Sequence, residues 1–99
     1  MKIAVMGYGT IGSGVVEVLR INKEKIAKRA GEPVEVKYIL DLREFPGDPM
    51  EDAIVHDYQT IANDPEIGIV VETMGGVEPA YTFVKVMLEA GKQVTTSNK

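Results

Sequence analysis

The stretch KIAVMGYGTIGSG, residues 2–14, decides the fold. Residues 2–6 form a short, largely apolar run that stops at Gly7, as a buried parallel strand would. From about Thr10 onward, apolar residues recur at three- and four-residue spacing, which predicts an amphipathic helix. These apolar residues are Ile11, Val15, Val18, Leu19 and Ile26. A strand that leads through a glycine-rich turn into a helix is the first unit of an alternating α/β fold.

The turn between this strand and this helix has the pattern G-x-G-x-x-G. Its residues are Gly7, Tyr8, Gly9, Thr10, Ile11 and Gly12. Gly7 permits a tight turn, Gly9 lets the backbone approach a pyrophosphate, and Gly12 allows the helix to pack closely on the strand. The helix N-terminus presents N–H groups and a partial positive charge to phosphates. The pattern alone is weak, but its place between a strand and a helix predicts a dinucleotide site for NAD(P). A glycine-rich turn without a ligand is the alternative.

Strands and helices are expected to alternate along the whole chain. The first helix is predicted to run to about Arg29, before Gly31 and Pro33. Further strands are expected at 34–41, 53–56, 67–72 and 93–97, a loop at 42–52, a brief helix at 58–63 and a helix from Pro79 to Gly91 with Phe83, Val84, Met87 and Leu88 in its apolar stripe. This alternation predicts a parallel sheet with right-handed crossovers, in the order 3-2-1-4-5 of a Rossmann-like domain. We expect residues 1–99 to form this one domain.

An acidic and a basic side chain follow the second predicted strand. Asp41 stands where the fold places a carboxylate for the adenosine ribose hydroxyls, which favours NAD. Arg43, two residues later, is suited to the 2′-phosphate of NADP instead. The sequence does not decide between these cofactors, and a solvated Asp–Arg pair at a strand end is the alternative to both.

Two other loops are expected at the same edge of the sheet. In the order 3-2-1-4-5, the loops after the first and fourth strands face each other, and ligands bind between them. Gly75 and Gly76 follow the fourth strand, so their backbone is expected to lie against the nicotinamide ribose. Lys99 follows the fifth strand, which would place its ammonium group near the nicotinamide and a substrate. A plain turn and a solvated terminal lysine are the respective alternatives.

Composition excludes several classes of function. The chain has 15 acidic and 11 basic side chains and a net charge of −4, which argues against a nucleic-acid surface. Cysteine is absent, and the single histidine, His56, has no ligand-spaced partners, so we expect no metal site and a surface or strand-end role for His56. No run approaches the ~20 apolar residues that span a bilayer, and residues 1–6 do not resemble a signal peptide. These features predict a cytoplasmic protein without membrane contact.

Three segments together resemble homoserine dehydrogenase. They are GYGTIGSGV at 7–15, VVETMGGVEPA at 70–80 and EAGKQVTTSNK at 89–99. The last two segments are much more specific than the glycine loop. The resemblance covers essentially the whole chain, but only the front part of the family's longer enzyme.

The resemblance implies an NAD(P)-dependent interconversion of aspartate 4-semialdehyde and homoserine, within threonine and methionine biosynthesis. In the family the glycine-loop backbone, the glycine pair and the lysine contact the cofactor, which implies these roles for Tyr8, Gly9, Thr10, Ile11, Gly75 and Lys99. The substrate-binding carboxylates and the proton-donating lysine belong to a later region. No residue of 1–99 is therefore assigned a catalytic role, apart from a possible auxiliary role for Lys99, and residues 1–99 alone are expected to be inactive.

Two other functions remain open on the sequence alone. One is a related dehydrogenase that acts on a neighbouring small molecule, and the other is a non-catalytic dinucleotide-binding or redox-sensing module. The last predicted strand leaves an unpaired sheet edge, and such edges invite pairing with another chain. We therefore also expect a homo-oligomer.

Overall fold

A parallel sheet lies at the centre of the computed structural model, which describes residues 1–74 and 80–96. The elements are β1 Lys2–Met6, α1 Thr10–Ile21, α2 Lys23–Ala30, β2 Glu35–Leu40, the 3-10 helix η1 Glu51–Ala53, β3 Ile54–Val55, α3 Tyr58–Ala62, β4 Ile67–Glu72, α4 Ala80–Glu89 and β5 Gln93–Thr96. The strands are ordered β3-β2-β1-β4-β5, and each neighbouring pair is parallel. The predicted Rossmann-like sheet and its strand order are confirmed.

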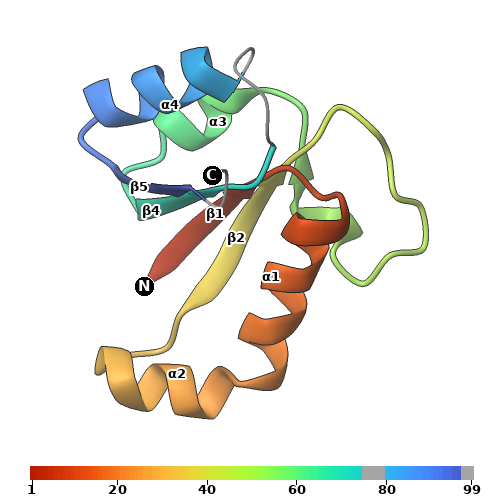
Figure 1. Cartoon of the computed structure of the whole chain (residues 1–99), viewed down its shortest axis with the longest axis vertical. Helices are drawn as coiled ribbons and strands as arrows, with labels where there is room; N and C mark the ends of the chain where they lie inside the picture. Colours follow the sequence, from red (N-terminus) through yellow and green to blue (C-terminus); the bar gives the residue numbers. More distant parts are fainter. Residues whose placement is uncertain (75–79, 97–99) are drawn as a thin grey trace.

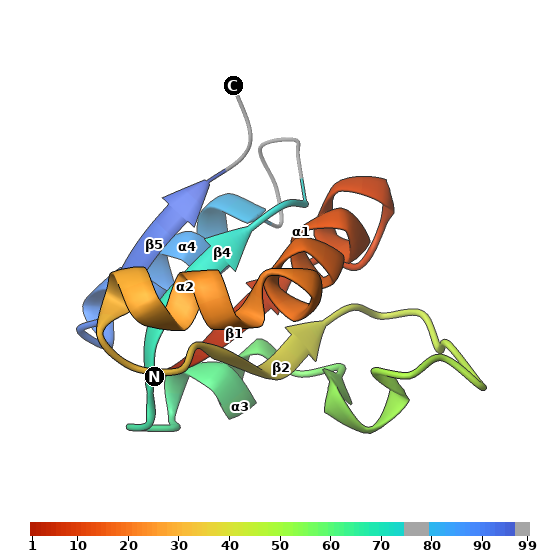
Figure 2. The same cartoon turned by 90° about the horizontal axis from the view of Figure 1, so that it is seen from below.

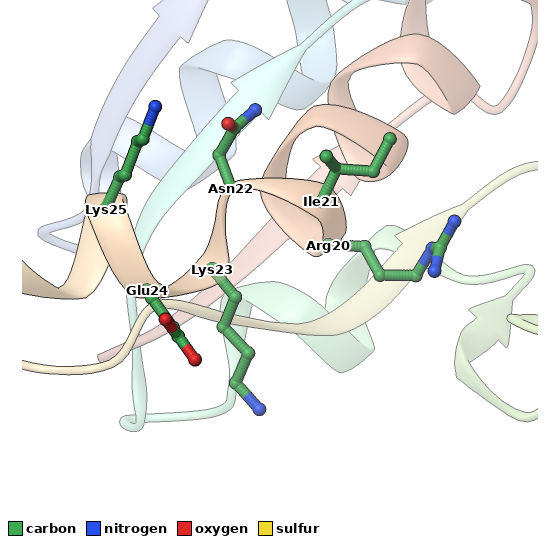
Figure 3. Close-up of a pocket in the computed structure, with 6 residues that line it drawn as sticks. All are labelled: Arg20, Ile21, Asn22, Lys23, Glu24 and Lys25. Carbon is green, nitrogen blue, oxygen red and sulfur yellow. The ribbon is translucent and has the colours of Figure 1, made fainter.

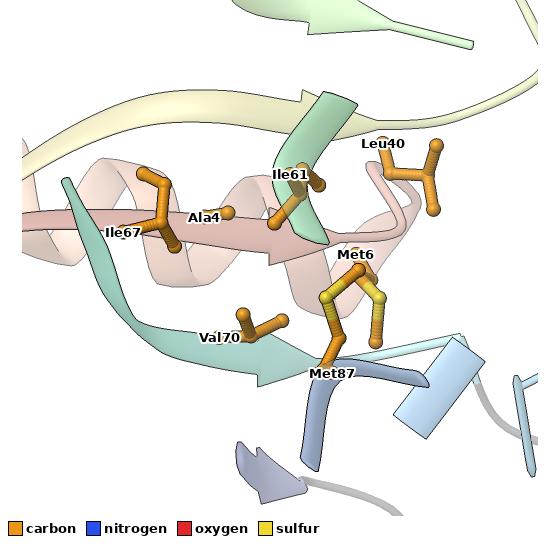
Figure 4. Close-up of a cluster of buried hydrophobic side chains, with 7 residues drawn as sticks. All are labelled: Ala4, Met6, Leu40, Ile61, Ile67, Val70 and Met87. Carbon is orange, nitrogen blue, oxygen red and sulfur yellow. The ribbon is translucent and has the colours of Figure 1, made fainter. Parts of the chain in front are cut away.

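Helices lie on both faces of this sheet. α3 and α4 cover one face, while α1 and α2 lie on the other (Figure 1). Between the sheet and the α3–α4 pair lies the larger apolar cluster, which Figure 4 shows in close-up: Ala4, Met6, Leu40, Ile61, Ile67, Val70 and Met87. A smaller cluster of Val5, Val16 and Ile39 lies under α1. Because both faces of the central strands are covered, their sequences are apolar at nearly every position.

The first helix is interrupted, and its prediction as one continuous helix was wrong. α1 ends at Ile21, and Asn22 leaves helical geometry with φ −100° and ψ 24°. The side-chain amide of Asn22 donates to the Val18 carbonyl, which its backbone N–H also reaches. Asparagine competes in this way with helix hydrogen bonding. α2 then continues in a new direction to Gly31, whose φ of +80° ends it as predicted.

The buried side of α1 also differs from the predicted stripe. Gly12 and Val16 face the sheet and are buried, whereas Ile11 and Val18 are 56% and 55% exposed. Gly12 lies close to β1, and this contact turns its side of the helix inward. The predicted stripe missed this side because it was built from apolar residues only and left glycine out. In α4, Met87 is buried as expected, but Leu88 is 55% exposed.

The connection between α3 and β4 is attached to β2 through Asp64. Its carboxylate accepts hydrogen bonds from the Lys37 ammonium at 2.6 Å and from the Tyr38 hydroxyl at 2.8 Å. Mainly because Lys37 donates to it, the pKa of Asp64 is lowered to about 2. The folded protein therefore holds Asp64 ionised at pH values where an unfolded chain binds a proton.

We predict that Asp64→Asn reduces the loss of stability in acid. An unfolded aspartate titrates near pH 4, so the stabilisation by Asp64 is present above pH 4 and is lost as the pH falls towards 2. Urea unfolding at steps of half a pH unit from pH 6 to 2 measures how steeply the free energy of unfolding falls with pH, which we call the slope. The exposed Asp52 offers a control, since Asp52→Asn should keep the wild-type slope; an unchanged slope in Asp64→Asn would contradict the prediction.

Within residues 1–74 and 80–96, none of the helices combines the length and the apolar character that a membrane crossing requires. The same part of the chain contains no group of three or more histidine, cysteine, aspartate or glutamate side chains that would hold a metal ion.

Candidate functional site

The glycine loop joins β1 to α1 in a tight turn. Gly7 has a φ of +103°, a conformation that favours glycine, and its N–H donates to the Leu40 carbonyl at 2.7 Å. A Cβ on Gly12 would lie 1.9 Å from the Gly7 carbonyl oxygen, so only glycine fits there. Among the described residues, a Cβ on Gly9 would meet just one neighbour, the Arg43 guanidinium at 3.8 Å. Gly7 and Gly12 thus shape the turn, whereas Gly9 is not crowded by any of the described residues.

The N-terminus of α1 follows directly from this turn. Gly9 is the N-cap, and its carbonyl accepts the N–H of Ser13 at 2.9 Å. No side chain of the described residues caps this end of the helix, and its first turn contains no acidic residue. The partial positive charge of the helix therefore lies beside Gly9 with no acidic side chain in the first turn of α1, which suits a phosphate.

Asp41 lies beside the loop and is bonded to it. One carboxylate oxygen accepts the Tyr8 N–H at 2.9 Å and the Arg43 Nη2 at 2.9 Å. The other accepts the backbone N–H and Nε of Arg43 at 2.9 and 3.0 Å. The side chain of Asp41 is 9% exposed and that of Arg43 is 63% exposed. The predicted pair exists, but the side chain of Asp41 is largely covered and is bonded to the glycine loop, so the pair is not simply solvated.

These contacts fix the charge of Asp41. Mainly because the Arg43 side chain donates to it, the pKa of Asp41 is lowered to about 2, against the opposing effect of burial. Asp41 is therefore a carboxylate at any physiological pH, and every group that binds it must donate a hydrogen bond. Each of its two oxygens accepts two hydrogen bonds from the protein, so a ribose hydroxyl that binds Asp41 replaces one of these donors.

The side chain of Tyr8 holds the loop after β2 against the glycine loop. Its hydroxyl donates to the Asp48 carboxylate at 2.9 Å, and its ring packs edge-on against Phe45 with centroids 5.0 Å apart. Burial, followed by the Asp48 contact, raises the pKa of Tyr8 to about 12. The Arg43 guanidinium lies 5.2 Å above the Phe45 ring. The irregular loop at 42–50 therefore has a fixed place at the edge of the site.

A cavity of about 410 Å³ opens between these groups, at the carboxyl ends of β1, β2 and β4. It is lined by Gly7, Tyr8, Gly9, Leu40, Asp41, Leu42, Arg43, His56, Thr73, Met74 and Phe83. The structure thus brings the glycine loop, Asp41 and Arg43 together around one space. Gly75, Gly76 and Lys99 lie outside the described residues.

His56 lines the same cavity, although the sequence indicated only a surface or strand-end position. It follows β3, and its Nδ1 lies 2.7 Å from the Asp41 carbonyl oxygen. Since a carbonyl only accepts, this nitrogen carries the proton. Nε2 is 4.0 Å from the Glu44 carboxylate. The position of His56 directly after a predicted strand could have indicated this place. The carboxyl ends of parallel strands meet at one edge of the sheet, which is where the cavity lies.

Glu72 and Thr73 connect the strand ends on the other side of the cavity, and the sequence did not single them out. The Thr73 hydroxyl reaches the carbonyls of Met6 and Gly7 at 2.9 and 3.1 Å. Glu72 is 3% exposed and accepts the Met74 N–H at 2.7 Å and the Thr96 hydroxyl at 2.9 Å. These contacts hold the ends of β1, β4 and β5 in register beside the glycine loop.

Comparison with known proteins agrees with this arrangement. The family model described as "Homoserine dehydrogenase, NAD binding domain" matches residues 7–99. The chain belongs to the homoserine dehydrogenase family. The matched part is the NAD-binding domain, so the cofactor is NAD(P), and the predicted resemblance is confirmed.

Individual homoserine dehydrogenases match over the whole chain. The protein from Pseudomonas aeruginosa is 41% identical over 100 residues, which are 100% of this chain and 23% of that protein. The protein from Helicobacter pylori is 39% identical and is covered over 24% of its length. A crystal structure of S. aureus homoserine dehydrogenase superimposes with a TM-score of 0.88 at 33% identity, over 100% of this chain and 26% of that one. The chain thus spans about a quarter of the length of these relatives.

The residues present fit the phosphate and ribose parts of NAD(P). Gly9 leaves room beside the N-terminus of α1, which suits a pyrophosphate. Asp41 is ionised beside the cavity, which suits ribose hydroxyls as donors. Arg43 is exposed next to Asp41 and Gly9, where a 2′-phosphate of NADP would meet it.

Proposed function

We propose that residues 1–99 form a single NAD(P)-binding domain of a homoserine dehydrogenase. The whole enzyme interconverts aspartate 4-semialdehyde and homoserine, and serves threonine and methionine biosynthesis in the cytoplasm. The observation that carries the proposal is the bond from the Tyr8 N–H to Asp41, because it joins the phosphate loop to the ribose carboxylate in one preformed site. The family match supports the same conclusion.

Each part of the site has a separate role in this proposal. The backbone from Gly7 to Gly12 holds the pyrophosphate at the α1 N-terminus, and Asp41 or Arg43 holds the adenosine ribose. The family resemblance assigns Gly75, Gly76 and Lys99 to the nicotinamide half. When bound, NADPH or NADH supplies the hydride that reduces the aldehyde carbon, while a proton goes to its oxygen. The residues that bind the substrate and donate the proton belong to the part of the polypeptide outside this domain.

Arg43 and Asp41 are proposed to let the site accept both cofactors. With NAD, the ribose hydroxyls replace Arg43 as donors to Asp41, and the guanidinium swings towards solvent, where 63% of it already lies. With NADP, Arg43 turns to the 2′-phosphate and keeps it apart from the Asp41 carboxylate. His56, with one nitrogen bound to the Asp41 carbonyl, forms a fixed wall of the adenosine end in both cases.

A chimera tests the proposed activity. Residues 1–99 replace the matching N-terminal part of the P. aeruginosa homoserine dehydrogenase, and oxidation of NADH or NADPH by aspartate 4-semialdehyde is followed at 340 nm. We expect turnover by the chimera and none by residues 1–99 alone. A folded chimera that binds cofactor but does not reduce the semialdehyde would refute the proposed reaction and would favour a binding or sensing module.

A further inference from the structure

The loop after β2 contains a tight turn of four residues, Phe45-Pro46-Gly47-Asp48. The Asp48 N–H donates to the Phe45 carbonyl at 3.1 Å, and Gly47 has a φ of +81°. Proline in the second position and a glycine with positive φ in the third are typical of a type II turn. The loop extends away from the strands before it returns to η1 (Figure 2). Within this extended loop, the turn fixes the positions of Phe45 and Asp48 relative to each other.

Tyr8 of the glycine loop holds both ends of this turn. Its ring packs against the Phe45 ring at an interplanar angle of 86°, and its hydroxyl donates to the Asp48 carboxylate. The same Asp48 oxygen accepts the Met50 N–H at 2.8 Å, and Met50 packs against the smaller apolar cluster under α1. Tyr8 and Phe45 are both half-buried. The turn is therefore attached to the glycine loop at two points, which gives the Phe45 ring a fixed orientation.

The face of the Phe45 ring lies under the Arg43 guanidinium. The central carbon of the guanidinium is 5.2 Å from the ring centroid, within the distance of about 6 Å over which an aromatic face attracts a cation. Stacking on a ring uses the flat face of a guanidinium, whereas its N–H groups point outwards from the edge. Asp41 accepts from only two of the five N–H donors of Arg43. Phe45 thus supports the guanidinium without occupying its hydrogen-bond donors.

The cations at the α1–α2 junction differ from Arg43. Lys23 and Lys25 extend in opposite directions from the chain (Figure 3), and none of the described residues that line the cavity at this junction is aromatic. A long cationic side chain that is free to move loses rotamer freedom when a ligand orders it, which costs affinity. Arg43 has already lost part of this freedom between Asp41 and the Phe45 ring.

We propose that Phe45 raises the affinity for NADP relative to NAD by positioning Arg43. With NADP, the guanidinium turns its edge from Asp41 towards the 2′-phosphate and keeps its face on the Phe45 ring, which Tyr8 holds in place. Phe45 itself touches neither the ribose nor the phosphate, so it is a positioning residue that acts through Arg43. NAD has no 2′-phosphate, and its binding does not use this support. The inference rests on the proposed function, since it requires Arg43 to bind the 2′-phosphate.

The test compares Phe45→Leu with Phe45→Tyr in residues 1–99, by calorimetric titration of NADP and of NAD. Leucine is apolar but has no aromatic face, so the Kd for NADP should rise about three- to tenfold, while the Kd for NAD stays within about twofold. Tyrosine keeps the ring, so Phe45→Tyr should keep both wild-type values. In the Arg43→Ala background, Phe45→Leu should change neither Kd further, because Phe45 acts through Arg43.

Tyr8→Phe is a second variant that decides the question if Phe45→Leu does not fold. It keeps both rings and removes only the hydroxyl bond to Asp48. Because the Phe45 ring is then held at one point instead of two, we expect a smaller rise in the Kd for NADP, about two- to threefold, and no change for NAD. Thermal unfolding of each variant shows that the titrated protein is folded.

Four results would overturn the inference. Phe45→Leu could leave NADP binding unchanged, or it could weaken both cofactors equally, in which case the loop would shape the site as a whole. Phe45→Tyr could lose as much NADP affinity as Phe45→Leu, or Phe45→Leu could weaken NADP binding further in the Arg43→Ala background. A failure of the inference alone leaves NAD binding and the effect of Arg43→Ala intact. Wild-type residues 1–99 that bind neither cofactor would instead refute the proposed function, and the inference with it.

Discussion

Gly12→Ala should lower the melting temperature of the chain by about 12–24 °C. A Cβ at this position would lie 1.9 Å from the Gly7 carbonyl oxygen and 2.9 Å from the Thr73 hydroxyl, so α1 has to move away from β1. Overpacking of this kind costs about 3 kcal/mol at its upper range, and each kcal/mol corresponds to about 4–8 °C in a domain of this size. The same movement opens the glycine loop, so NAD(P) binding should be lost even below the new melting temperature.

Gly14→Ala is the matched control for Gly12→Ala. Gly14 lies on the same helix, two residues away, but its added methyl group would meet no atom of the described residues within 4 Å. Replacing a helical glycine with alanine stabilises by about 1 kcal/mol, so this variant should melt at a slightly higher temperature and keep its cofactor affinity. Thermal unfolding followed by circular dichroism measures both melting temperatures. If both variants lost the same amount of melting temperature, the close packing of Gly12 on Gly7 would not be what stabilises the turn.

Arg43→Ala should weaken NADP binding by roughly ten- to a hundredfold and leave NAD binding within about threefold. This loss of affinity corresponds to the free energy that one charged hydrogen bond to a phosphate contributes. Asp41 would lose its side-chain donors from Arg43 and become available to ribose hydroxyls, so NAD does not depend on Arg43. Calorimetric titration of both cofactors into the chain gives the two dissociation constants. Arg20→Ala is the control, since Arg20 is 64% exposed and pairs only with Glu17 among the contacts described.

Asp41→Asn should shift the cofactor preference away from NAD and towards NADP. The amide keeps the size of the side chain and an oxygen for the Tyr8 N–H, but it loses the charge that favours ribose donors and repels a 2′-phosphate. We expect NAD binding to weaken about tenfold and NADP binding to weaken less or to improve. If Arg43→Ala and Asp41→Asn weakened both cofactors equally, the two side chains would not discriminate between them.

The features that the sequence predicted correctly are those with local signals. The glycine loop, Asp41 at the end of β2 and the buried strand Ile67–Glu72 are each indicated by a few consecutive residues. The strand order follows from the alternation of strands and helices, since handedness and crevice rules leave few alternatives. The cavity that Asp41 and Arg43 line together with the glycine loop could therefore be located from the sequence.

The features that the sequence missed depend on contacts between distant residues. His56 meets Asp41 across 15 positions, and Thr73 meets Gly7 across 66. The inward side of α1 was predicted only in part. Val15 packs against the core as expected, but Ile11 and Val18 are exposed, because Gly12, which carries no hydrophobic signal, lies closest to β1. The break at Asn22 arises from one side-chain amide that competes with the helix. Neither effect is visible in the spacing of apolar residues.

The most direct test of the cofactor site is the thermal unfolding of residues 1–99 with NAD and with NADP. A ligand that binds only the folded form adds about 1.4 kcal/mol of stability at ten times its Kd, which corresponds to a rise of about 6–11 °C for a domain of this size. We predict a saturable rise of this kind with at least one cofactor, and its loss in Gly12→Ala. A melting temperature unchanged by millimolar concentrations of either cofactor would contradict the proposed site.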